Sequence, residues 1–195
     1  MAKIILDLCG GTGAWSRPYA NAGYDVRVIT LPKYDVRTYV PPDNVYGILA
    51  APPCTEFSVS GAQYWPVKDE DGRTDRALDI VDSCFRVIMQ ASPVWWALEN
   101  PIGRLRRLRM FALGEPVLLF NPCDYGDAYT KKTILWGKFN LPKQNPVEPV
   151  FIRDSVRGRK YSPINWHTGG RSEKTKRLRS MTPPGFASAF FKANQ

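Results

Sequence analysis

Four short apolar segments alternate with polar or amphipathic stretches along the first half of the chain. They cover residues 3–8, 24–30, 45–51 and 94–98. Apolar runs of this length, bounded by glycine, proline or charged residues, predict buried β-strands. Between the last two runs, residues 75–91 repeat apolar side chains at helical spacing, which predicts one long amphipathic helix.

Two shorter helices complete the expected fold. Residues 14–22 have a helical pattern closed by Gly23, and residues 183–194 place Phe186 and Phe190 on one helical face. Strands that alternate with helices usually form a parallel sheet with right-handed crossovers. The pattern therefore predicts an α/β protein with a Rossmann-like, doubly wound parallel sheet.

Two polar stretches interrupt this pattern. Residues 65–74 (WPVKDEDGRT) are charged and contain glycine, so we expect a mobile loop there. Residues 141–179 are rich in proline, glycine and basic side chains, which predicts a small irregular lobe. We expect a core at residues 1–137, this basic lobe at 138–180, and a C-terminal helix at 181–195 that packs back on the core.

Charge separates the front of the chain from its rear. The 195 residues carry a net charge of +9 and are 44% hydrophobic, which suits one globular domain. Residues 1–137 hold 15 basic and 15 acidic side chains, whereas residues 138–180 hold 11 basic and 3 acidic ones. This asymmetry predicts contact with a polyanion, most simply nucleic acid, although a basic tail that only aids solubility has the same composition. The candidate nucleic-acid-binding side chains of the lobe are Arg153, Arg157, Arg159, Lys160, Arg171, Lys174, Lys176, Arg177 and Arg179.

The cysteine pattern argues against a metal site and leaves the thiols available for chemistry. Cys9, Cys54, Cys84 and Cys123 are widely spaced, and the chain has one histidine, so no zinc motif is present in the sequence. We see no signal peptide and no apolar run of about 20 residues. We therefore expect no metal, no membrane contact, and a reducing cytoplasm in which cysteines stay free.

Three segments with chemical potential follow predicted strands. Residues 7–13 (DLCGGTG) form a glycine-rich turn between strand and helix, where backbone N–H groups can approach a ligand. Pro52-Pro53-Cys54 places a thiol at another strand end, and Glu99-Asn100-Pro101 places a carboxyl group behind two tryptophans. Each segment alone also has a purely structural explanation: a plain turn, a core cysteine, or a capping loop.

Together and in this order, the three segments resemble the DNA cytosine-5 methyltransferases. Residues 52–58 (PPCTEFS) match the PPCxxFS nucleophile segment of that family, and residues 99–101 match its ENP variant. The resemblance is sharp over residues 1–137 and loose beyond, where the short recognition region is similar to compact orphan enzymes carried by viruses of bacteria. A bacterial or phage-infected cytoplasm and a monomer acting on duplex DNA are the corresponding expectations.

The resemblance implies a role for each residue that matches a family motif. Cys54 would be the nucleophile and Glu99 the acid at nitrogen 3 of cytosine, with Asn100 holding the loop. Ser58 would contact nucleic acid. The residues implied for S-adenosylmethionine are Asp7, Leu8, Cys9, Gly10, Gly11, Thr12, Gly13, Trp15, Asp35 and Pro52.

This chain also departs from the family pattern at three points. Cys9 replaces an aromatic ring against the cofactor, and Thr30 replaces an acid at its ribose. The paired arginines of a late strand are replaced by Thr130-Lys131-Lys132-Thr133, which leaves Lys131 or Lys132 to take one cationic role.

Three other interpretations were weighed against this one. Amino-methyltransferases that act on base nitrogens carry an aromatic ring after their prolines, so Cys54 disfavours that class. An RNA or tRNA cytosine-5 methyltransferase uses the same chemistry, and basic residues serve either polymer. A catalytically inactive DNA-binding relative stays open because the cationic motif is thinned.

Overall fold

A six-stranded sheet forms the centre of the molecule. The computed structural model describes residues 2–155, 158–164 and 173–195. The strands of the sheet are β1 (Ile4–Leu8), β2 (Asp25–Ile29), β3 (Val45–Ala50), β4 (Trp95–Pro101), β5 (Leu118–Phe120) and β6 (Thr133–Lys138). Their order across the sheet is β2-β1-β3-β4-β6-β5.

The sheet is mostly parallel, which confirms the predicted α/β, Rossmann-like class. Strands β2, β1, β3 and β4 run parallel to one another. The predicted parallel sheet has one antiparallel strand, β6, which pairs with both β4 and β5. The chain passes from β5 to β6 through residues 121–132, which contain the 3-10 helix η2 (Pro122–Tyr125) but no α-helix of the kind that usually joins parallel strands.

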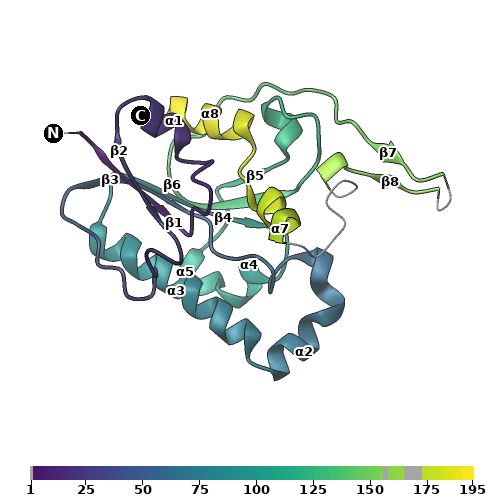
Figure 1. The fold of residues 1–195 in the computed structure, drawn as a ribbon, viewed down its shortest axis with the longest axis horizontal. Helices are drawn as coiled ribbons and strands as arrows, with labels where there is room; N and C mark the ends of the chain where they lie inside the picture. Colours follow the sequence, from purple (N-terminus) through teal and green to yellow (C-terminus); the bar gives the residue numbers. More distant parts are fainter. Residues whose placement is uncertain (1, 156–157, 165–172) are drawn as a thin grey trace.

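Helices cover both faces of this sheet (Figure 1). On one side lie α2 (Trp65–Glu70), α3 (Arg73–Ala91), α4 (Leu105–Leu108) and α5 (Met110–Leu113). On the other side lie α1 (Arg17–Asn21) and α8 (Pro184–Ala193), which contact each other. The first helix was expected from residue 14, but the glycine turn continues to Ser16 before the helix begins.

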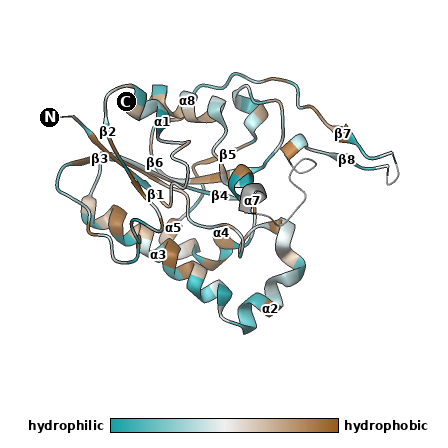
Figure 2. Ribbon diagram, in the orientation of Figure 1, coloured by the Kyte–Doolittle hydropathy of each residue, from teal (hydrophilic) through white to brown (hydrophobic). Residues whose placement is uncertain are grey.

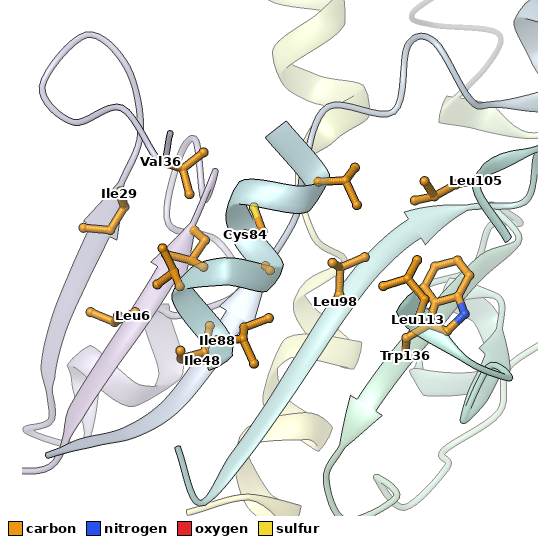
Figure 3. Close-up of a cluster of buried hydrophobic side chains, with 14 of the residues drawn as sticks. Leu6, Ile29, Val36, Ile48, Cys84, Ile88, Leu98, Leu105, Leu113 and Trp136 are labelled. Carbon is orange, nitrogen blue, oxygen red and sulfur yellow. The ribbon is translucent and has the colours of Figure 1, made fainter. Parts of the chain in front are cut away.

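Helix α3 packs the core on its side of the sheet. Cys84 and Ile88 on α3 face side chains of β1, β3 and β4, among them Leu6 and Leu98 (Figure 3). The brown inner face and teal outer face of α3 in Figure 2 show the same amphipathic pattern that predicted this helix. The helix begins at Arg73, two residues before the predicted start.

An aromatic cluster fills the opposite layer. Phe186 and Phe190 of α8 pack against Trp15, with ring centroids 6.0 and 5.5 Å away. Tyr19 of α1 stacks on Trp95 at 5.5 Å and donates its hydroxyl hydrogen to the Asn194 carbonyl oxygen. The C-terminal helix is therefore fixed beneath the strand β1 end that carries the glycine turn.

The expected mobile loop at residues 65–74 is helical, which corrects that prediction. Trp65–Glu70 form α2, after the 3-10 helix η1 (Val59–Tyr64), and α3 starts three residues later. Buried hydrogen bonds from Lys68 and Arg104 hold this region to the rest of the chain. Hydrogen bonds to residues distant in sequence cannot be predicted from the local content of charged residues and glycine.

The basic rear of the chain is a long extended segment followed by a hairpin and a helix. The hairpin strands are β7 (Ile152–Arg153) and β8 (Lys160–Tyr161), and they project away from the sheet in Figure 1. Helix α7 (Glu173–Ser180) is regular structure within the stretch predicted to be irregular. Its sequence EKTKRLRS is rich in good helix formers, which is the physical reason. Among the described residues, no helix combines the length and apolar character needed to cross a membrane.

Candidate active site

A pocket opens at the carboxyl ends of β1, β3 and β4. It encloses about 570 Å³ of empty space, part of it open to solvent. The carboxyl edge of parallel strands is where α/β folds commonly bind ligands. The pocket is lined by Asp7, Cys9, Gly10, Gly11, Thr12, Ala14, Trp15, Ala51, Pro52, Pro53, Cys54, Glu99, Pro101, Lys131, Ser180 and Thr182.

The glycine turn forms one wall of the pocket with exposed backbone. Cys9, Gly11 and Gly13 all adopt left-handed conformations, with φ of 57°, 54° and 65°. At Gly10 a Cβ atom would lie 2.3 Å from the Asp7 Cγ atom, so only glycine fits beside that carboxyl group. The turn therefore offers main-chain atoms rather than side chains to a ligand.

Asp7 lies fully buried beneath this turn. Ser16 donates its hydroxyl hydrogen to Asp7 Oδ2 at 2.6 Å, while Asp7 Oδ1 has no hydrogen-bond partner among the described residues. Burial raises the pKa of Asp7 from 3.8 to about 6, against the lowering effect of the Ser16 hydrogen bond. The indole N–H of Trp15 is likewise buried without a partner in the described chain.

Three residues implied for cofactor binding lie outside the pocket lining. Leu8 is buried in the hydrophobic core between the sheet and α3. Gly13 lies behind the turn, with Val28 and Ser16 closest to its open side. Asp35 forms an ion pair with Arg37 at 2.6 Å, and these hydrogen bonds lower its pKa to about 2. The structure thus brings seven of the ten expected cofactor residues together.

Cys54 faces the pocket from the turn that follows β3. Burial raises the pKa of its thiol, and the neighbouring Glu99 carboxylate adds to that effect. Lys131 and Arg179 act in the opposite direction and lower the same pKa. One acidic and two basic side chains near the thiol therefore shift its pKa in opposite directions.

Glu99 reaches the pocket from within strand β4. The sequence placed it after the strand, but pairing with β6 extends β4 to Pro101, with Glu99 opposite Leu135. Burial raises the pKa of Glu99, and Lys131 opposes this shift. A carboxyl group with a raised pKa can act as a proton donor near neutral pH.

Asn100 and the two lysines occupy different surroundings. The Asn100 side chain donates a hydrogen bond to the Pro52 carbonyl oxygen at 3.2 Å, and so ties β4 to the segment before Cys54. Lys131 lines the pocket, whereas Lys132 lies outside it and accepts the Ile102 N–H at its carbonyl oxygen. Of the two lysines, Lys131 is the one in a position to contact a ligand.

Two polar residues of the pocket lining were missed by sequence reasoning. Ser180 ends α7 and Thr182 precedes α8, and both line the pocket opposite the strand ends. The Thr182-Pro183-Pro184-Gly185 segment was the available signal, because it marks where the basic lobe returns to the core.

The basic side chains divide between the hairpin and α7. Arg153, Arg159 and Lys160 are exposed on the hairpin, and Arg177 and Arg179 are exposed on α7. Lys174 and Lys176 belong to α7 by backbone. Arg157 and Arg171 lie outside the described residues. Ser58, outside the pocket lining, has its hydroxyl 3.0 Å from that of Ser60.

These features define an α/β protein of the Rossmann-like class with a thiol and a carboxyl group in the pocket beside its glycine turn. Within the described part of the chain, no group of three or more His, Cys, Asp or Glu side chains is arranged to hold a metal ion. No family model matches the chain.

Comparison with known proteins finds methyltransferases. The chain is 26% identical over 174 residues to the type II methyltransferase M.DdeI of Desulfomicrobium norvegicum (strain DSM 1741 / NCIMB 8310). The match covers 68% of this chain and 39% of that relative, so the chain spans about two fifths of the relative's length.

Two solved structures are similar to this chain at lower sequence identity. One is described as a DNA modification methyltransferase encoded within a prophage (E. coli), with a TM-score of 0.48, 18% identity, and coverage of 76% of this chain and 53% of that one. The other is a DhpI–SAM–HEP complex, with a TM-score of 0.30, 13% identity, and coverage of 69% and 63%.

Proposed function

We propose that this protein is an S-adenosylmethionine-dependent DNA methyltransferase that methylates carbon 5 of cytosine, with Cys54 as the nucleophile. The observation that carries the proposal is the meeting of Cys54, Glu99 and Lys131 with the glycine turn in one pocket. Cys54 follows β3, Glu99 lies near the end of the adjacent strand β4, and Lys131 precedes β6. The similarity to M.DdeI supports the DNA-methylating part of the proposal.

The glycine-turn side of the pocket fits the cofactor. The pocket is open to solvent on one side, and the glycine turn lines it with backbone that a small molecule can approach closely. Gly10, Gly11 and Thr12 would hold the cofactor by their backbone, and the unpartnered Asp7 Oδ1 and Trp15 N–H are polar atoms that a ligand can satisfy. When bound there, S-adenosylmethionine supplies an electrophilic methyl group on its sulfonium.

Cys54 activates the base. Carbon 5 of cytosine is too weak a nucleophile on its own, and addition of the Cys54 thiolate at carbon 6 converts the ring into an enamine. Lys131 and Arg179 favour the thiolate form of Cys54. After carbon 5 has gained the methyl group, loss of the carbon-5 proton and elimination of the Cys54 thiolate restore the ring.

Glu99 controls the charge that this addition creates. Because burial raises its pKa, Glu99 holds a proton more readily than an ordinary glutamate and can donate it to nitrogen 3 of cytosine. Protonation of Glu99 also removes the negative charge that raises the pKa of Cys54. The protonated acid and the thiolate nucleophile therefore favour each other.

The target base must leave the duplex to reach this pocket. Flipping a base out of the stack costs a few kcal/mol, which phosphate contacts elsewhere on the protein can offset. The exposed basic side chains of the β7–β8 hairpin and α7 supply such contacts under this proposal.

A methyl-transfer assay with labelled cofactor tests the reaction and its substrate. Duplex DNA, single-stranded DNA and tRNA are offered separately, and the position of the label is read by nucleoside analysis. We expect 5-methylcytosine in duplex DNA. Label in tRNA alone, or on a base nitrogen, would contradict the proposal.

Cys54→Ala tests the nucleophile. We expect turnover to disappear while the dissociation constant for the cofactor is retained, because the thiol contacts the base rather than the methyl donor. With 5-fluorocytosine in the target DNA the final proton loss is blocked, so a covalent protein–DNA adduct should accumulate with the wild type. Cys123→Ala, at a buried thiol outside the pocket lining, is the matched control and should still form the adduct.

The basic lobe should bind DNA through phosphates and read little sequence. Its long, exposed side chains suit phosphates better than base edges. We expect a methylation context of about two to four base pairs and a log–log salt slope of about −0.9 per phosphate neutralised. Arg153→Ala combined with Lys160→Ala should flatten that slope equally for all sequences. Bisulfite sequencing that finds a site of about six or more defined base pairs would overturn this part.

A further inference from the structure

The turn that carries Cys54 has all of its main-chain acceptors occupied. The Cys54 carbonyl oxygen accepts the N–H groups of Phe57 and Ser58 at 3.0 and 2.9 Å. The Phe57 carbonyl oxygen accepts the N–H of Arg104 at 3.0 Å. The two carbonyl oxygens between them, of Thr55 and Glu56, accept from side chains.

Those two donors are buried cations. Lys68 Nζ lies 2.6 Å from the Thr55 carbonyl oxygen, and Arg104 Nε lies 3.0 Å from the Glu56 carbonyl oxygen. Each cation is only 5% exposed. Burying a positive charge is costly unless its donors are satisfied, so these contacts are a specific feature of the fold.

Arg104 also joins the Cys54 turn to the helices behind it. Its guanidinium donates to the Asp69 carboxylate at 2.9 Å and to the Thr74 hydroxyl at 2.6 Å, and its centre lies 4.9 Å from the centroid of the Trp65 ring. Lys68 makes a similar link from α2, with Nζ 3.0 Å from Glu56 Oε2. The helical region 65–74 is thereby fastened to the residues that directly follow the thiol.

Close packing of the backbone also holds the Cys54 turn against the segment after β4. A Cβ atom at position 103 would lie 2.0 Å from the Phe57 carbonyl oxygen, so only glycine allows this approach. Ser58 and Gly103 form an isolated antiparallel bridge, and Val59 donates its N–H to the Ile102 carbonyl oxygen. The Cys54 turn is thus fixed to the segment that directly follows β4, the strand that carries Glu99.

We propose that Arg104 and Lys68 are positioning residues that fix the Cys54 turn, and with it the thiol, relative to Glu99. The inference rests on the proposed function and deepens it. A buried ion pair that only stabilised α2 would satisfy its donors with side chains. Here Lys68 and Arg104 donate instead to the carbonyl oxygens of Thr55 and Glu56, the two residues that directly follow the nucleophile. Fixing a reacting atom in this way raises the rate rather than the affinity.

Arg104→Met tests the proposal through kinetics. We expect kcat for DNA methylation to fall by about 100-fold, the cost of a displacement of about 1 Å in a reacting group. The cofactor dissociation constant and the KM for DNA should stay within about threefold, because neither reports the position of the thiol. Lys68→Met should act in the same direction.

Arg109→Met is the matched control. Arg109 is also an arginine of the segment after β4 and is ion-paired with Asp82 at 2.7 Å, but its side chain donates to Asp82 and to the Leu108 carbonyl oxygen rather than to the Cys54 turn. It should keep the kcat of the wild type. Equal losses in both variants, or an unchanged kcat in Arg104→Met, would overturn the proposal.

Alkylation of Cys54 by iodoacetamide gives a readout that needs no methyl transfer. The modification is followed on the Cys54 peptide by mass spectrometry as a function of pH. Releasing the turn should expose the thiol and bring its raised pKa toward the ordinary value, so alkylation below that pKa should accelerate by about threefold for each unit by which the pKa falls. Arg109→Met should keep the wild-type profile.

Asp69→Asn keeps the proposal testable if Arg104→Met does not fold. The Asp69 side chain is 53% exposed, so its replacement loosens the Arg104 guanidinium without emptying the core. We expect a smaller change in alkylation in the same direction, and an unchanged profile would overturn the positioning role. If wild-type protein methylates nothing, the proposed function fails, while the alkylation comparison still decides whether Arg104 fixes the thiol.

Discussion

Two turns meet at the same edge of the sheet and are held in opposite ways. The glycine turn follows β1, and the Cys54 turn follows the adjacent strand β3. The Cys54 turn has the carbonyl oxygens of residues 54–57 all hydrogen-bonded, two of them to buried cations. The glycine turn contains three left-handed residues and lies over Asp7 Oδ1 and the Trp15 N–H, which have no hydrogen-bond partner in the described part of the chain.

This difference suits the two turns to different functions. Buried polar side-chain atoms without partners among the described residues are costly, and a ligand that satisfies them gains affinity from that cost. A nucleophile gains instead from being held in one place before the substrate arrives. One turn is therefore suited to a ligand that comes and goes, and the other to a fixed reacting group.

Glu99→Gln should break the chemistry while leaving the glycine turn intact. An amide can hydrogen-bond to nitrogen 3 but cannot deliver a proton, so we expect the methylation rate to fall by about 10²–10⁴-fold with unchanged cofactor affinity. In the wild type, Glu99 must be protonated, so the rate should decline as pH rises through its raised pKa. Rate–pH profiles of both proteins check this, and a loss below about tenfold would mean that the carboxyl group is structural.

Asp7→Asn should change the stability of the glycine-turn region in a pH-dependent way. A pKa raised from 3.8 to about 6 means that the folded state favours the protonated form. The resulting stabilisation is fully present below about pH 4 and is lost as pH rises through about 6, a difference of about 3 kcal/mol.

Asparagine has no carboxyl group to titrate at this position. The variant should therefore gain stability over the wild type by up to about 3 kcal/mol at pH 8 and show no gain at pH 4. Urea unfolding at the two pH values measures the difference. Equal shifts at both pH values would show that the pKa of Asp7 is the same in the folded and the unfolded protein, and so is not raised by burial.

Gly10→Ala should weaken cofactor binding and spare the thiol. The added methyl group would meet the Asp7 carboxyl group at 2.3 Å, which displaces the backbone or the carboxyl group. We expect about a tenfold loss of affinity, or about 1.4 kcal/mol, by calorimetry, with Cys54 alkylation unchanged. Gly23→Ala is the control, because it introduces left-handed strain where the described residues leave open space and lies outside the pocket lining.

Sequence patterns predicted the structure correctly where the pattern arises within a single helix or strand. Helix α3 and the strand ends that carry the glycine turn and Cys54 follow from apolar periodicity and from glycine and proline placement. The helix at residues 65–70 was missed because its stability comes from long-range contacts, between Lys68 and Thr55 and between Asp69 and Arg104, which are 35 residues apart. Strand β4 was ended too early for the same reason, since pairing with β6 carries it through Glu99 to Pro101.

By itself the sequence determined the α/β class, the order of the chemical groups along the chain, and the basic character of the rear. Those properties depend on residue type and on neighbours a few positions away. Only the tertiary structure decided that Lys131 rather than Lys132 lines the pocket, that Asp35 pairs with Arg37 outside it, and that Ser180 and Thr182 close it. Which groups share a pocket depends on how strands and helices distant in sequence pack, and that packing fixes burial, charge proximity and hence pKa.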